Sequence, residues 1–270
     1  MSSELLDAIA RGVTVFDLSR PMAIGMAQSP NHPAFKLSMP RKHGDSMRED
    51  GSSAANDLLE TGTHVGTHID ALGHVSFCGE LHGGVSAAEA QESGRLSTHG
   101  VEEIQPIIAR GVLLDIARLH GVESLEGGYE VTVADLEAAA GEVPEGIQPG
   151  NVILVRTGWG KHWEDTEAYV GKASGVPGVS ESGAYWCASH SPIAVGGDSI
   201  AFECLVAGAG HALLPAHRVL LVEKGIYIME TMALEELSEA GHVEFLMVVS
   251  PLPLVGATGS PIRPLAVVGL

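Results

Sequence analysis

The sequence predicts a mixed α/β fold in which helices pack against one sheet. Short apolar runs bounded by glycine recur along the chain and have the length of buried strands. Helical patterns separate some of these runs, whereas others follow one another directly, so the sheet should be mixed. No repeat, low-complexity tract or linker divides the 270 residues. We therefore expect a single domain over 1–270.

The N-terminal half begins with a predicted strand over residues 14–18. Residues 20–56 follow; they are rich in Pro, Ser, Asp and Met and show no hydrophobic periodicity, which predicts a long loop or lid. Such loops are uncommon unless they have a function. Residues 111–116 form the next apolar run and predict a buried strand.

The C-terminal half alternates helices with strands. Thr132 is a predicted N-cap with Asp135 at the third helical position, so a helix should cover residues 133–141. Another helix is expected over about 215–224. Apolar runs predict the remaining strands at 151–157, 192–196, 226–230, 243–249 and 262–268.

Composition excludes several classes of function. The chain has 34 acidic and 15 basic residues, and its net charge of −19 repels nucleic acids and anionic membranes. No apolar run reaches the ~18 residues of a membrane span, and the first ten residues lack the basic region of a secretory leader. Three cysteines without a CxxC pair indicate reduced thiols. We therefore expect a cytoplasmic protein that acts on a small molecule.

One segment concentrates groups that bind metals or carry protons: His64, His68, Asp70 and His74 fall at even positions. In an extended chain this period places them on one face. At ~3.3 Å per residue His64 and His68 would lie about 13 Å apart, so the segment must bend, and Gly66 can provide the turn. Imidazole and carboxylate suit zinc, manganese or ferrous iron. The pattern therefore predicts a metal site.

Residues 64–74 resemble the His-x-Gly-Thr-His-x-Asp-x-Pro-x-His motif of the metal-dependent cyclase-like hydrolases, which include bacterial kynurenine formamidases and isatin hydrolases. Segments similar to other family elements occur in the expected order at 17–19, 149–159, 197–199 and 217–230. The resemblance implies a swivelling β/β/α-like fold. It also implies a homodimer or homotetramer, in which the 20–56 excursion covers a neighbouring site.

The same resemblance implies roles for individual residues. His64, His68 and Asp70 match the ligands of a divalent metal, Mn²⁺ or Zn²⁺. His74 matches a catalytic histidine just outside the metal shell. Leu72 replaces the proline of the family motif, which implies a looser backbone approach to His74.

A late pair and several aromatic residues complete the expected site. His217 and Glu230 match a pair that binds a second metal or orders the active-site water. Glu230 ends an apolar run, where a carboxylate costs free energy unless it is paired or bound to metal. Phe35, Trp159 and Trp186 are candidates for lining the substrate pocket.

The leading hypothesis is a metal-dependent hydrolase that opens a cyclic, isatin-like amide with metal-activated water and with His74 as proton shuttle. Alternatives are an arylformamidase acting on N-formylkynurenine and a lactone hydrolase. Residues 20–28 lack the tryptophan that lines the formamidase pocket, which favours the isatin-hydrolase branch. In a different class, the chain could be a non-catalytic protein that binds metal or a small molecule, but such a protein would not need His74. A closed structural zinc site, usually rich in cysteine, ranks last.

Overall fold

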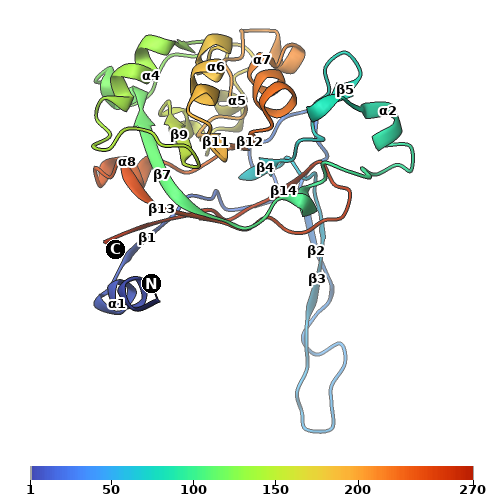
Figure 1. The fold of residues 1–270 in the computed structure, drawn as a ribbon. Coiled ribbons are helices and arrows are strands. Elements are labelled where there is room, and N and C mark those ends of the chain that lie inside the picture. Colours follow the sequence, from blue (N-terminus) through green and yellow to red (C-terminus); the bar gives the residue numbers. More distant parts are fainter. Residues whose placement is uncertain (1, 270) are drawn as a thin grey trace.

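The computed structural model describes residues 2–269, and a nine-stranded sheet forms its centre (Figure 1). Its strands are β1 Thr14–Asp17, β4 His68–Asp70, β7 Ile107–Asp115, β9 Val152–Arg156, β11 Ala194–Gly197, β12 Tyr227–Glu230, β13 Glu244–Val249, β14 Gly259–Pro261 and β15 Leu265–Val268. Their order is β1-β15-β13-β7-β9-β11-β12-β4-β14. The neighbours among β7, β9, β11 and β12 pair in parallel, and all other neighbours pair antiparallel. The predicted mixed α/β fold is confirmed.

The α-helices are short. They are α1 Ser2–Arg11, α2 Ala87–Ala90, α3 Ile116–Leu119, α4 Val133–Ala140, α5 Thr166–Val170, α6 Glu181–Ser189, α7 Pro215–His217 and α8 Glu235–Glu239. Helix α7 continues as a π-helix over Arg218–Lys224. The predicted helix at 215–224 is therefore present, but its second part has the wider π-helical turn. Single 3₁₀ turns lie at His82–Gly84, Val101–Glu103, Trp159–His162 and Gly210–Ala212, and two small sheets pair β5 Glu80–Leu81 with β6 Val85–Ser86 and β8 Glu130–Val131 with β10 Gly178–Val179.

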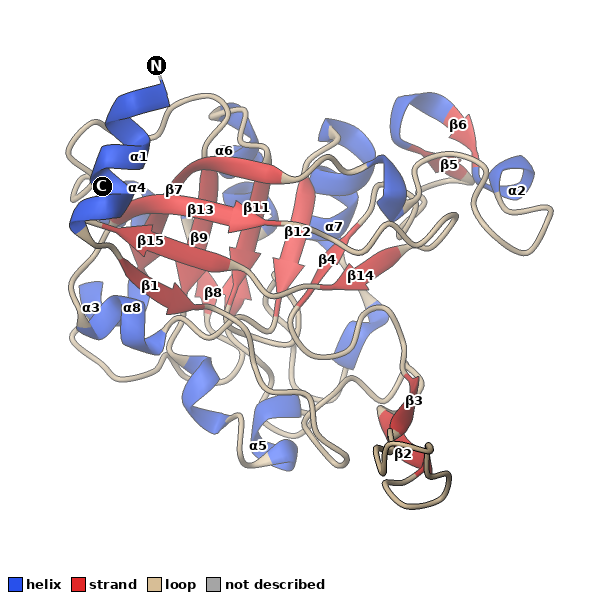
Figure 2. Ribbon diagram, turned by 90° about the horizontal axis from the view of Figure 1, so that it is seen from below, coloured by secondary structure: helices blue, strands red, loops and turns tan. Residues whose placement is uncertain are grey.

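Side chains alternate between the two faces of the central strands. In β7, Val112 and Leu114 point into a core shared with α4, α6 and α7, whereas Leu113 points into a second core that includes Leu237 of α8. Figure 1 shows α4, α6 and α7 gathered on one side of the sheet, and Figure 2 shows the sheet from below. Both faces are thus covered, as the continuous apolar runs of these strands require.

Local signals in the sequence were reliable where they had a stereochemical cause. Thr132 and Asp135 form a reciprocal capping box at the start of α4, as predicted. Gly66 has a φ of 70° and makes the expected turn before β4. Only His68–Asp70 is a strand, so the rest of the segment 64–74 forms turns on either side of it.

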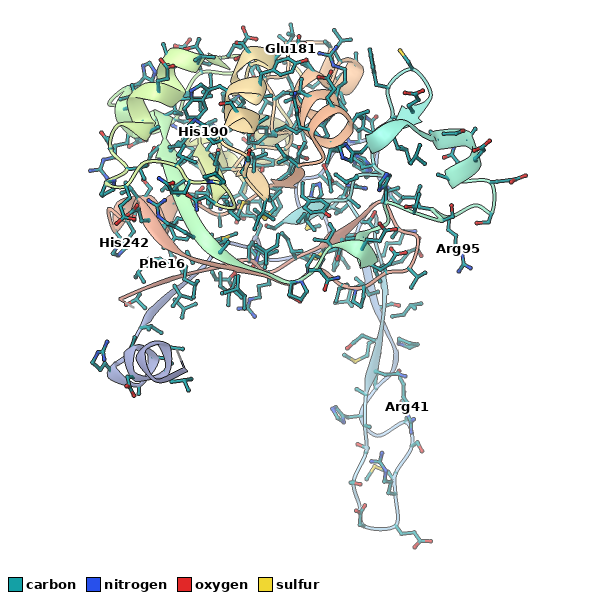
Figure 3. The ribbon with its side chains drawn as sticks, viewed as in Figure 1. Phe16, Arg41, Arg95, Glu181, His190 and His242 are labelled. Atoms are coloured by element: carbon teal, nitrogen blue, oxygen red, sulfur yellow. The ribbon has the colours of Figure 1, made fainter. Side chains whose placement is uncertain are left out.

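The loop or lid excursion predicted over 20–56 contains regular structure that was not predicted. Strands β2 Lys36–Arg41 and β3 Asn56–Glu60 pair antiparallel in a hairpin that extends away from the sheet, with Arg41 on it (Figures 1 and 3). Every residue of both strands is exposed. In β2, Leu37 and Met39 alternate with Lys36 and Ser38, a signal that the prediction missed, whereas the adjacent Leu58 and Leu59 of β3 break such an alternation.

Within residues 2–269, no helix is long and apolar enough to cross a lipid bilayer.

Candidate metal centre

The centre begins with the antiparallel pairing of β4 and β12. His68 lies opposite Glu230, and Asp70 lies opposite Ile228. Residues directly opposite in a sheet share a face, and so do residues two apart in a strand. His68, Asp70 and Glu230 therefore all face the side on which α7 packs, while Ile69 points into the other core.

Helix α7 adds the fourth side chain. The Nε2 atom of His217 lies 3.3 Å from Oδ2 of Asp70 and 3.3 Å from Oε1 of Glu230. On the other side, Nε2 of His68 lies 3.5 Å from Oδ1 of Asp70 and 3.4 Å from Oε2 of Glu230. Two imidazole nitrogens and two carboxylates thus converge, and all four side chains are buried.

Further hydrogen bonds fix the orientation of both imidazoles. The Nδ1 atom of His68 donates to the carbonyl of Gly66 at 2.8 Å, and Nδ1 of His217 donates to Oε2 of Glu203 at 2.6 Å. In each ring, Nε2 is therefore the atom that faces the carboxylates. Metal-binding histidines usually have such partners. The two Nε2 atoms are therefore oriented to coordinate a cation, which would displace a proton from them on binding.

Glu203 is a residue of the candidate centre that the sequence analysis missed. It lies in the segment between β11 and α7, and only 1% of its surface is exposed. A signal for it existed: Glu203 interrupts the apolar residues around Phe202, and a carboxylate in such surroundings needs a partner. The partner, His217, lies 14 positions further along the chain, so no local pattern identified it.

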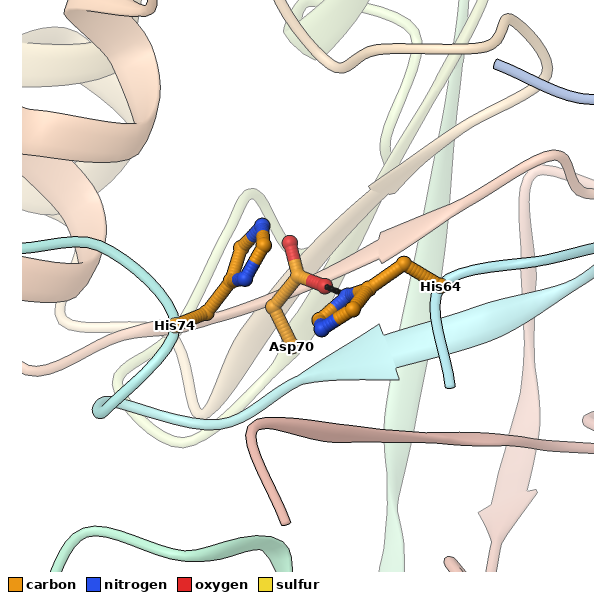
Figure 4. Close-up of side chains that lie close together, drawn as sticks. All are labelled: His64, Asp70 and His74. Atoms are coloured by element: carbon orange, nitrogen blue, oxygen red, sulfur yellow. Dashed lines mark hydrogen bonds and ion pairs between the residues drawn. The ribbon is translucent and has the colours of Figure 1, made fainter. Parts of the chain in front are cut away.

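His64 and His74 lie on either side of Asp70 (Figure 4). The Nδ1 atom of His64 donates to Oδ1 of Asp70 at 2.6 Å, and its Nε2 lies 2.8 Å from the Thr258 hydroxyl. The rings of His64 and His74 stack with centroids 3.8 Å apart. Gly259 makes room for this arrangement, because a Cβ there would lie 2.6 Å from Cε1 of His64.

The structure thus brings all six predicted residues together: His64, His68, Asp70, His74, His217 and Glu230. It groups them differently from the expectation. His217 and Glu230 place their donor atoms beside the carboxylate of Asp70, whereas both ring nitrogens of His64 already contact other protein groups. His74 belongs to a group with His64 and Asp70 close enough to share an ion, although it was expected just outside the metal shell.

The charges of the centre favour a cation. Asp70, Glu203 and Glu230 are buried carboxylates, and no lysine or arginine within the described chain pairs with any of them. The Oδ2 atom of Asp70 is buried without a hydrogen-bond partner in residues 2–269. Uncompensated buried charge is costly, so this donor set fits a divalent metal ion.

Burial and the neighbouring charges also shift the pKa values of the ionisable side chains in the centre. Burial disfavours the charged form of His217, but Glu203 and Glu230 outweigh this effect and raise its pKa well above 6.5. Burial likewise raises the pKa of Asp70, but the imidazoles of His74 and His64 outweigh it and lower the pKa. Burial lowers the pKa of His74 to about 3, so its ring is neutral at physiological pH.

A cavity of about 170 Å³ opens onto the centre. Its floor includes His64, His68, His74, His217 and Glu230.

The pocket residues expected from the sequence lie elsewhere. Phe35, Trp159 and Trp186 do not line this cavity. Trp159 is buried in a separate core, where its Nε1 donates to the carbonyl of Tyr169 at 2.9 Å. Trp186 packs against the core beneath α6, and Phe35 is buried near Gln28. Aromatic residues have structural uses throughout a fold, so their presence in the sequence did not identify the pocket.

The amino-acid sequence of this chain is similar to a family of proteins and to individual named relatives. The family model described as "Putative cyclase" matches residues 16–204. "Cyclase-like protein 3" of Oryza sativa subsp. japonica is 28% identical over 81% of this chain and 67% of its own length. "Isatin hydrolase" of Roseibium aggregatum is 26% identical over 81% of this chain and 77% of its own length.

Two solved structures show the same fold. A structure described as a novel cyclase has a TM-score of 0.85 at 29% identity, over 98% of this chain and 93% of the other. An isatin hydrolase bound to the product analogue thioisatinate has a TM-score of 0.73 at 22% identity, over 99% of both chains. With the family model matching well over half of its residues, this chain belongs to the cyclase family.

Proposed function

We propose that this protein is a metal-dependent hydrolase that opens a cyclic amide, the bond class that its relative isatin hydrolase acts on by name. The observation that carries the proposal is the convergence of His68, His217, Asp70 and Glu230, with His74 beside them and a cavity above. These four side chains would hold Mn²⁺ or Zn²⁺. A cation in this place supplies Lewis acidity, which acidifies water and polarises a carbonyl.

The protein's own groups account for the proton transfers. His74 is neutral and lines the cavity, so it accepts a proton from the attacking water. As the ring C–N bond breaks, His74 returns this proton to the departing nitrogen, and the product is one ring-opened molecule that carries both a carboxylic acid and an amine. Asp70 lies beside His74 (Figure 4), and its negative charge stabilises the imidazolium that forms between these steps.

The experiment is an activity screen of metal-loaded full chain against isatin, N-formylkynurenine and small cyclic amides and lactones. Metal content is measured on the same sample. Hydrolysis that depends on bound metal, with a cyclic amide as the best substrate, is the expected result. Protein with a full complement of metal that hydrolyses none of the panel would contradict the proposal and favour a binding protein.

A further inference from the structure

The metal centre lies at the point where two strands stop pairing. β4 and β12 are neighbours in the sheet (Figure 2), and the pair His68–Glu230 is the last in their register. Thr67 and Thr231 occupy the next position on the two chains, and both side chains are buried. The contact between these two residues therefore affects how His68 and Glu230 approach each other.

Thr231 has a strained backbone. Its φ is 59°, in the left-handed region that non-glycine residues rarely adopt. The branched Cβ of threonine makes this conformation costly, so it persists only where the surrounding structure enforces it. The residue before Thr231 is Glu230, whose Oε2 lies 3.4 Å from Nε2 of His68. Relaxation of Thr231 would therefore move the end of β12 that carries this carboxylate.

The hydroxyl of Thr67 is placed to enforce the strained conformation. It accepts a hydrogen bond from the amide of Arg20 at 2.8 Å and donates to the carbonyl of Thr231 at 2.6 Å. A hydroxyl has one proton and two lone pairs, so the bond from the Arg20 amide leaves its proton available to the carbonyl. A side chain of the segment before β4 thus holds the chain that follows β12, one position beyond the metal centre.

Other hydrogen bonds hold the same segment to different parts of the fold. The amide of Thr231 donates to the carbonyl of Ser199 at 3.0 Å, and Nη2 of Arg20 donates to the carbonyl of Met232 at 3.2 Å. These two bonds connect the segment to the chain after β11 and to the chain after β1. The Thr67 hydroxyl connects it to β4. Loss of this hydroxyl should therefore affect the centre more than the rest of the fold.

We propose that Thr67 is a positioning residue of the metal centre: its hydroxyl keeps Thr231 in the left-handed conformation and so holds Glu230 opposite His68. This inference rests on the proposed function, because Thr67 acts through side chains that would hold the ion. Without the hydroxyl, the carbonyl of Thr231 loses its donor, and Thr231 relaxes toward an ordinary conformation. The carboxylate of Glu230 then moves relative to His68, and metal affinity falls.

The Kd for Mn²⁺, measured on the full chain by titration against a chelator, tests the proposal. Thr67→Val keeps the shape of the side chain without the hydroxyl, and we expect its Kd to be about 10-fold weaker, the lower end of the loss that follows removal of a ligand's support. Thr67→Ser keeps the hydroxyl and should restore most of the affinity. Thr67→Ala differs from Thr67→Ser in the hydroxyl alone, so this second pair gives the same contrast if the valine variant does not fold.

Thr132→Val is the matched control, and thermal unfolding of the metal-free proteins is measured beside the titrations. It makes the same substitution at the exposed N-cap of α4, so it should lower Tm and leave Kd unchanged. Equal Kd in wild type, Thr67→Val and Thr67→Ala, or the same weakening in Thr67→Ser and Thr67→Ala, would overturn this inference and leave the proposed function standing. Wild-type protein that binds neither Mn²⁺ nor Zn²⁺ would overturn the proposed function and this inference with it.

Discussion

Replacing Glu203 by glutamine perturbs the metal centre without removing a side chain that would touch the ion. Glu203 is buried, and its Oε2 accepts the Nδ1 proton of His217 at 2.6 Å. Glutamine has nearly the same shape but no charge, so the Nε2 atom of His217 becomes a weaker ligand. Loss of such a partner costs about 10–100-fold in metal affinity, which equals about 1.4–2.7 kcal/mol at 25 °C.

Competition with a fluorescent chelator measures the Kd for Mn²⁺ and Zn²⁺ in wild type and in Glu203→Gln. Glu137→Gln is the control, since it removes the same charge from an exposed position on α4. We expect the 10–100-fold loss in the first variant and no change in the control. A folded Glu203→Gln protein that binds both metals as tightly as wild type would refute the view that Glu203 supports the centre through His217.

Three further predictions concern packing, pH and assembly. Gly259→Ala places a Cβ 2.6 Å from Cε1 of His64, so we expect metal affinity in the same titration to fall about 10-fold or more, and an unchanged Kd would count against the arrangement. Asp135→Asn should cost about 0.3–1 kcal/mol of unfolding free energy at pH 7, because it removes the negative charge of the capping box in the first turn of α4. Partial burial raises the pKa of Asp135, but hydrogen bonds from Thr132 and other neighbours outweigh this effect and keep the pKa below 3.8. The stabilisation by the charged carboxylate is therefore present above pH 3.8 and lost as the pH falls below it. Denaturation experiments that show the same difference between wild type and variant at pH 2.5 and at pH 7 would contradict this. Finally, we propose a homodimer or homotetramer, because the β2–β3 hairpin extends from the body with several apolar side chains exposed (Figure 1). The molar mass from light scattering at micromolar concentration should exceed the 28.1 kDa of one chain, and a monomeric mass would contradict the proposal.

Elements with a local cause could be predicted from the sequence. The apolar runs identified the central strands because buried parallel strands are apolar on both faces. The Thr132–Asp135 pair identified the start of α4, and Gly66 identified the turn before β4. The β2–β3 hairpin was missed, because both strands are fully exposed and the alternation of Leu37 and Met39 with polar residues in β2 is too short to stand out.

Most residues of the candidate site could be predicted from the sequence, but their arrangement in space could not. The spacing of His64, His68, Asp70 and His74 is enough by itself to indicate a metal site. Which atoms converge depends on the pairing of β4 with β12 and on the packing of α7, both of which are long-range. For the same reason, the sequence did not show that the cavity wall includes His32 and His211, or that none of the described residues lining it is a tryptophan.

The central claim is that His68 holds the metal while His74 moves the proton. The most direct measurement determines bound metal and kcat on the same samples of wild type, His68→Ala and His74→Ala, with the best substrate of the screen. The account predicts that His68→Ala loses metal and activity together, whereas His74→Ala keeps its metal and loses about 10²–10⁴-fold in kcat. Loss of metal from His74→Ala in step with activity, or full metal in His68→Ala, would contradict it.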